Sequence, residues 1–207
     1  MQTEKIYNGL LAQKLIEEFE LRNFEGFYCE TKEQAKQTIL DMISPSALVS
    51  CGGSQTIQQI GLRDALHQGE YNFLDPLAVQ GSGAMDEIAH RALQADYFIM
   101  GANAITEAGE LVNMDGYGNR VASLIFGPKQ VIVVAGLNKV EPTLEAAILR
   151  VKTYAARMVL LLFNQAYSSF AELDQAAQTA GSHLVVTNRA PVKGRIKVIL
   201  VGESLGF

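Results

Sequence analysis

The sequence predicts an α/β fold, in which helices cover both faces of a mostly parallel, open sheet. Short apolar runs without polar alternation, such as 97–100 and 130–135, are typical of strands that are buried on both faces. Segments with a helical spacing of apolar residues separate these runs, as repeated strand–helix units require. The C-terminal part differs, because 184–187 and 196–201 are β-rich runs with no predicted helix between them.

The first half of the chain begins with an amphipathic helix predicted over 4–22, which forms a helical arm of about residues 1–24. The capping-box pattern Thr31-x-x-Gln34 predicts a second helix over 32–43, and Ser44-Pro45 would end it. Apolar runs and turn residues then predict strands at 26–29, 47–51 and 71–74, and helices at 55–67 and 85–94.

The second half continues the alternation and ends in the β-rich segment. Because Pro favours the first turn of a helix, Pro142 is expected to open a long helix that reaches about residue 158. The two final β-rich runs are expected either to form a hairpin-like pair or to lie on a sheet edge. The other predicted elements are strands at 97–100, 110–114 and 130–135, and helices at 120–126 and near 170–179.

Composition narrows the class of protein. The 207 residues contain no linker, internal repeat or low-complexity segment, so a single domain over 1–207 is expected. The net charge of -5 argues against non-specific binding of nucleic acid, which needs a basic surface. No apolar run reaches the roughly 18 residues that a membrane span needs, and the acidic start does not resemble a secretion signal. A cytoplasmic protein is therefore expected.

The metal-binding and redox side chains are few. Cys29 and Cys51 lie outside any CxxC pattern, so buried thiols are expected rather than a disulfide. The histidines have no partner at the spacing of metal ligands, so no metal site is predicted. The sequence identifies no cofactor.

A first candidate loop follows the strand predicted at 47–51 and opens the next helix. Its glycines let the backbone approach a ligand, and the start of the helix offers free N–H groups to an anion. The pattern matches neither the dinucleotide nor the P-loop motif, and a tight turn with a capping Ser is the alternative interpretation. The candidate binding residues in this loop are Gly52, Gly53, Ser54 and Thr56.

A second candidate loop, 101–120, follows the strand at 97–100. It concentrates glycines, amides, carboxylates and an Arg more densely than a simple connection needs, although an elaborate turn is the alternative. Glu107 and Asp115 are the candidate acids or bases. The candidate binding residues are Asn103, Asn113, Gly116, Asn119 and Arg120.

A third candidate is Lys139, which follows the strand at 130–135. It could neutralise an anion that the other two loops hold, or it could be a solvated lysine before a helix. The three loops together predict a site for a small anionic ligand, because all of them follow the carboxyl ends of predicted parallel strands.

The second loop and its surroundings resemble the LUD domain, also called DUF162, of the lactate-utilisation small-subunit type. The resemblance covers nearly the whole chain and is carried by NAITEAGELVNMDGYGNR at 103–120, GPK at 127–129, VAGLNK at 134–139 and GRIKVILVGESLGF at 194–207. It implies a fold related to ribose-5-phosphate isomerase and CoA transferases. It also implies an accessory subunit for oxidation of L-lactate to pyruvate, with iron–sulfur proteins and other LUD-domain subunits as partners.

Two departures from the pattern that the resemblance implies bear on function. The related isomerases carry a catalytic carboxylate in a Gly-Ala-Asp turn, whereas this chain has Gly101-Ala102-Asn103. An amide cannot act as a general base, so the isomerase mechanism does not transfer. Many LUD proteins of this size also carry a Cys-rich segment, but 160–183 contains no Cys, so a redox role would depend on partner proteins.

Other functions are compatible with the same loops. One is a stand-alone enzyme that acts on a phosphorylated sugar or an acyl-CoA-like anion, and another is a ligand-binding module without chemistry. The amide at Asn103 favours binding over catalysis. A homodimer is a further expectation, formed through the amphipathic N-terminal helix or an edge strand.

Overall fold

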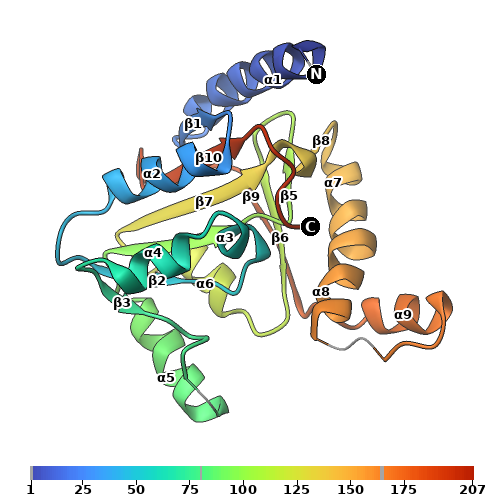
Figure 1. Ribbon diagram of the computed structural model, residues 1–207. Coiled ribbons are helices and arrows are strands. Elements are labelled where there is room, and N and C mark those ends of the chain that lie inside the picture. Colours follow the sequence, from blue (N-terminus) through green and yellow to red (C-terminus); the bar gives the residue numbers. More distant parts are fainter. Residues whose placement is uncertain (1, 80, 164–165) are drawn as a thin grey trace.

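The larger sheet of the protein has six parallel strands in the order β1-β10-β7-β4-β2-β3 (Figure 1). The computed structural model describes residues 2–79, 81–163 and 166–207. Met1 of the predicted arm and positions 164 and 165 of the Cys-free segment lie outside the described residues. The strands are β1 (Glu25–Cys29), β2 (Leu48–Cys51), β3 (Asn72–Leu74), β4 (Tyr97–Gly101), β7 (Gln130–Gly136) and β10 (Ile196–Val201). The predicted parallel sheet is confirmed.

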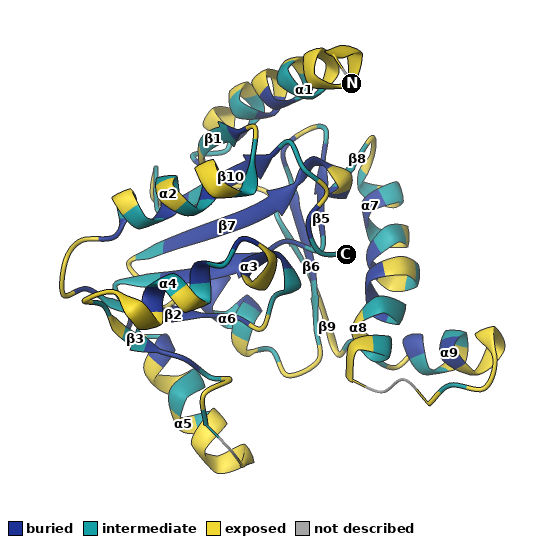
Figure 2. Cartoon of the chain, in the orientation of Figure 1, coloured by how far each residue is buried: buried dark blue, intermediate teal, exposed yellow. Residues whose placement is uncertain are grey.

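Helices cover both faces of this sheet, as predicted (Figure 1). The central strand β7 shows why: Val131 and Val133 pack into one hydrophobic cluster, and Ile132 and Val134 pack into the other. Figure 2 shows this strand as buried along its length. The first cluster includes residues of α1 (Gln2–Leu21), α5 (Ser82–Ala92) and α6 (Asn119–Ile125), and the second includes residues of α2 (Lys32–Met42), α3 (Gln55–Gln59) and α4 (Leu62–Gln68).

A second, four-stranded sheet has the order β8-β5-β6-β9. Its strands are β5 (Ala104–Thr106), β6 (Leu111–Asp115), β8 (Val140–Glu141) and β9 (His183–Thr187). The polar run 101–120 therefore contains two strands, of which only the one near 110–114 was predicted. A long helix packs on this sheet, where Ala104 and Val112 contact Ala147 and Val151.

The long helix has three parts and is followed by α9 (Phe170–Ala177). The parts are α7 (Leu144–Arg150), a π-helical segment (Val151–Ala155) and α8 (Ala156–Phe163). The prediction that Pro142 occupies its first turn is wrong. Thr143 is the N-cap, since its side chain accepts a hydrogen bond from the Ala146 N–H, so Pro142 lies outside the helix.

The C-terminal β-rich runs do not form a hairpin-like pair, because they belong to different sheets. β9 pairs antiparallel with β6 at the edge of the smaller sheet, which matches the second expectation for this run. β10 lies between β1 and β7, and the burial of all its residues except Lys197 suits a strand with partners on both sides. The connection crosses from one sheet to the other past the end of α1, where Ala190 N–H donates to the Arg22 carbonyl.

The helix predicted over 55–67 is broken into α3 and α4. Gly61 causes the break, because its φ of +66° is a left-handed conformation that a helix interior does not allow.

None of the helices within the described ranges is long and apolar enough to cross a membrane. Cys29 and Cys51 are buried free thiols, as predicted.

Candidate functional site

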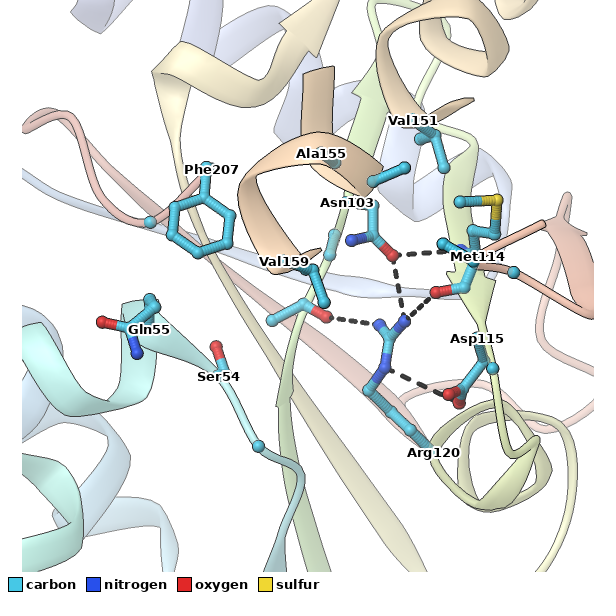
Figure 3. A pocket seen from close by; sticks show the side chains of 18 of the residues that line it. Ser54, Gln55, Asn103, Met114, Asp115, Arg120, Val151, Ala155, Val159 and Phe207 are labelled. Atoms are coloured by element: carbon cyan, nitrogen blue, oxygen red, sulfur yellow. Dashed lines mark hydrogen bonds and ion pairs between the residues drawn. The ribbon is translucent and has the colours of Figure 1, made fainter. Parts of the chain in front are cut away.

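A pocket of about 400 Å³ lies at the carboxyl edge of the larger sheet, next to the smaller sheet (Figure 3). The carboxyl ends of β2, β4 and β10 lead into the segments 53–56, 101–103 and 206–207, all of which line it. Ligands of open parallel sheets bind at this edge. The topology therefore brings together loops that are far apart in the sequence.

Most of the predicted site residues meet in this pocket, and four do not. Gly52, Asn113 and Asn119 do not line it: Gly52 packs against the Arg120 stem, Asn113 is buried, and Asn119 begins α6. Glu107 lies apart from the pocket, where it forms an ion pair with Lys14 of α1 at 2.7 Å. The predicted residues that line the pocket are Gly53, Ser54, Thr56, Asn103, Asp115, Gly116, Arg120 and Lys139.

Arg120 is the centre of a buried hydrogen-bond network (Figure 3). Its Nη1 donates to the Asn113 Oδ1 at 2.8 Å and to the Gly101 carbonyl at 3.2 Å. Its Nη2 donates to the Asn103 Oδ1 at 2.9 Å and to the Met114 carbonyl at 2.6 Å. The guanidinium group thus joins the end of β4 to Asn103 and to β6, and its hydrogen-bonding capacity is directed to the protein.

Asp115 and Asn103 complete this network. The Asp115 Oδ2 lies 3.8 Å from the Arg120 Nε and accepts a hydrogen bond from the Val121 N–H in the first turn of α6. Burial lowers the pKa of Arg120, and the charge of Asp115 opposes that effect. The Asn103 Oδ1 also accepts from the Met114 N–H, so this amide oxygen is fixed on the side of the network.

The amide group of Asn103 is consequently oriented. Since its oxygen faces Arg120 and Met114, its Nδ2 points the other way, toward the space between Phe207 and Val159 (Figure 3). The hydroxyl of Ser54 accepts from the Ile57 N–H and faces the same space. Its proton is available to a ligand, because a hydroxyl both donates and accepts.

Lys139 is buried, with 3% of its surface exposed, and lines the same pocket. Its Nζ donates to the Thr56 Oγ1 at 3.0 Å and to the Ala102 carbonyl at 3.0 Å, and both acceptors are uncharged. No carboxylate of the residues that the structure describes forms an ion pair with it. Burial is the main reason that the pKa of Lys139 falls to about 7, and the charges of Arg150 and Arg120 lower it further.

The C-terminal segment lies against this lysine. Gly206 has a φ of +59°, and a Cβ at this position would lie 2.5 Å from the Thr56 Oγ1 and 3.1 Å from the Lys139 Nζ. The Gly206 N–H donates to the Gln59 side chain, and the Leu205 N–H donates to the Asn138 side chain. A residue with a side chain at position 206 would disturb Lys139.

One wall of the pocket is apolar and was not predicted. Val151, Ala155, Val159 and Phe163 line it from the π-helical segment and α8. Their spacing of four residues forms a stripe, which sequence alone does not distinguish from a stripe that packs into the core. Phe207, opposite this helix in Figure 3, adds an aromatic ring. The pocket therefore suits a small ligand with one polar and one apolar end.

Other reactive groups near the pocket are less suited to chemistry. Cys51 is buried, and burial raises the pKa of its thiol to about 11, so it stays protonated near neutral pH. Within the described part of the chain, His, Cys, Asp and Glu side chains form no group of three that could hold a metal ion.

The fold and the pocket define an α/β protein with a polar site at the carboxyl edge of its sheet, and comparison with known proteins gives its family. The LUD domain matches residues 12–201, so the chain belongs to the LUD-domain family. No curated protein matches the chain.

Two solved structures are similar to this chain. A DUF162 family protein from Deinococcus radiodurans is 13% identical, with a TM-score of 0.59 over 94% of this chain and 98% of that chain. At this identity the similarity shows a shared fold. Ribose 5-phosphate isomerase A from Methanocaldococcus jannaschii is 14% identical, with a TM-score of 0.35 over 55% of each chain.

Proposed function

We propose that this LUD-domain protein binds a small carboxylate or phosphate-bearing metabolite in the pocket between its two sheets. Lys139 is the observation that carries the proposal. It is a buried cation without a carboxylate partner among the described residues, and it lines a pocket large enough for a small molecule. Because an uncompensated buried charge is costly, an anion beside Lys139 would restore the charge balance.

The remaining charges of the pocket favour the same sign of ligand. Asp115 and Arg120 also line it, but they pair with one another and leave no net negative charge. The hydroxyl of Ser54 and the Nδ2 of Asn103 supply neutral donors that face the cavity. A carboxylate or phosphate accepts hydrogen bonds from all of these groups.

The proposed physiological role is an accessory subunit in the oxidation of L-lactate to pyruvate. Family membership supports this role, together with a pocket of a size that suits a small hydroxy or oxo acid. The proposed partners are iron–sulfur proteins and other LUD-domain subunits, which would carry the electrons.

The second candidate function is that of an enzyme or binding module for a phosphorylated sugar or an acyl-CoA-like anion, which the cluster of polar donors also favours.

Isothermal titration calorimetry tests the binding proposal. L-Lactate, pyruvate, a sugar phosphate and an acyl-CoA are titrated into the wild-type chain and into Lys139→Met. We expect one class of anion to bind, and the variant to bind roughly tenfold to a hundredfold more weakly, as loss of a charged hydrogen bond predicts. No binding of any of the four anions would contradict the proposal.

Two controls make the result specific to the pocket. Lys129→Met removes an exposed lysine that pairs with Asp96 outside the pocket, so its affinity should equal that of the wild type. Thermal unfolding of each variant shows that it is folded.

The physiological role is tested by deleting the gene in the native cell, where normal growth on L-lactate would argue against it.

A further inference from the structure

We propose that Lys139 is a nucleophile that forms an imine with the carbonyl carbon of a small 2-oxo acid bound in the pocket. This inference rests on the proposed function, because it takes the anionic ligand as given and adds a covalent bond to it. The amine is placed for this reaction by burial at the pocket wall and by two uncharged acceptors. A nucleophilic amine must be unprotonated, and a carboxylate partner would hold it in its charged form.

Burial and the nearby charges disfavour the ammonium form of Lys139. The Thr56 hydroxyl, the Ala102 carbonyl and the backbone of Gly206 are its uncharged neighbours. The charged groups that act on it are Arg150 and Arg120, which are cations and repel a proton. With the pKa of Lys139 at about 7, a substantial fraction of the side chain is free amine at neutral pH.

The pocket also has separate groups for the two ends of a 2-oxo acid. The Ser54 hydroxyl and the Asn103 Nδ2 can donate to the carboxylate, whose carbon is bonded directly to the carbonyl carbon. The Lys139 Nζ donates a hydrogen bond to the carbonyl oxygen of Ala102. Since Ala102 precedes Asn103 in the chain, the amine lies near the backbone that carries the Asn103 side chain. A short apolar substituent of the acid would face Val159 and Ala155.

The reaction balances without an oxidant or a reductant. The lone pair of Nζ attacks the carbonyl carbon, a C–N bond forms, and the electron pair of the C=O bond moves to oxygen, which takes up a proton. The resulting carbinolamine then loses its hydroxyl group with a second proton as water, and the C–N bond becomes double. Both protons leave the nitrogen and end on the water, and the Thr56 hydroxyl, 3.0 Å from Nζ, can relay them.

Borohydride trapping tests this proposal. The full chain is incubated with pyruvate, reduced with sodium borohydride, digested and mapped by mass spectrometry. The expected result is an adduct on Lys139, with the mass of a reduced imine. In the variant Lys139→Arg, which keeps the charge but cannot form the imine, this adduct should be lost completely. L-Lactate, which has no carbonyl carbon of this kind, should give no adduct.

Calorimetry with the untreated wild-type chain distinguishes the two proposals. If pyruvate binds but borohydride leaves Lys139 unmodified, the imine is wrong and the binding function stands. Adducts spread evenly over Lys139 and exposed lysines such as Lys129 would also overturn the imine, because they would show that the pocket does not direct the reaction. If neither pyruvate nor L-lactate binds and no adduct forms, both proposals fail for these acids.

Discussion

Arg120 and Lys139 are two basic side chains that line the same pocket, yet their surroundings differ in kind. Arg120 is surrounded by acceptors from β4, from β6 and from Asn103 before β5, and it lies beside the carboxylate of Asp115. Lys139 has a hydroxyl and a carbonyl, and no carboxylate partner among the described residues. The difference indicates that Arg120 holds the two sheets together, whereas Lys139 is available to a ligand. The following experiments test that division.

The largest expected effect is loss of stability in Arg120→Met. The substitution removes the donor that Asn103 and Asn113 share and the cation beside the largely buried Asp115, and loss of one partner of a buried pair costs about 3–5 kcal/mol. Urea unfolding measures the change. Lys129→Met, in which an exposed ion pair is lost, is the control and should change the unfolding free energy much less. Equal losses in the two variants would contradict a structural role of Arg120.

Removal of the buried amine should have the opposite effect on stability, with a characteristic pH dependence. Between about 7 and the ordinary pKa of 10.5, the unfolded chain holds a proton on Lys139 that the folded chain lacks, so wild-type stability rises with pH through this range. Lys139→Met lacks this dependence. We expect the variant to be the more stable protein below pH 7 and its advantage to shrink as pH rises toward 10.5. Urea unfolding at several pH values measures the difference, and a constant difference would contradict the depressed pKa.

A smaller effect is expected for Gly206→Ala. The left-handed backbone and the contact of a Cβ with Thr56 and Lys139 predict a loss of about 1–2 kcal/mol and weaker ligand binding. Gly194→Ala is the matched control, because Gly194 also has a left-handed φ, of +74°, but does not line the pocket, and a Cβ there would be 3.6 Å from the Glu25 carboxylate. Thermal unfolding and calorimetry measure both variants. The control should lose stability but keep the ligand affinity of the wild type, and equal affinities in the two variants would contradict the role of the C-terminal segment in the pocket.

The smallest effect is expected for Glu107→Gln. Although the sequence suggested Glu107 as an acid or base, its carboxylate pairs with Lys14 outside the pocket. Ligand affinity should therefore remain that of the wild type, as calorimetry would show. A clear loss of affinity would show that Glu107 contributes to ligand binding.

The local signals of the sequence account for the parallel sheet but not for the pocket wall. Apolar runs such as 97–100 and 130–135 predict buried strands, since every residue in them must avoid water. The three residues of β5 lie in a polar run and pair with β8, more than 30 positions away, so no local pattern marks them. The stripe of Val151, Ala155 and Val159 has the same spacing as any core-facing helix.

The candidate site was predicted in part for a related reason. Polar residues in 101–120 point to a ligand, and several of them line the pocket. A sequence does not show which hydrogen bonds these residues make, and Arg120 and Asn113 make theirs with the protein itself. The availability of Lys139 depends on which residues surround it in three dimensions, and these come from positions 56, 102 and 206.

The π-helical segment, 151–155, has a consequence for how this pocket can change through insertion or deletion. A π turn accommodates more residues than an α turn, and such turns frequently occur at functional sites. Because a π turn holds about one residue more than an α turn, deleting one residue here would let the helix continue as a regular α-helix, with Val159 and Phe163 still on the side that faces the cavity. The same deletion in the α-helical part, at the start of α8, would instead turn the residues after it by about 100°. A change of one residue in length is thus absorbed at one place in this helix, whereas a few residues later it would replace the apolar wall and with it the shape of ligand that fits.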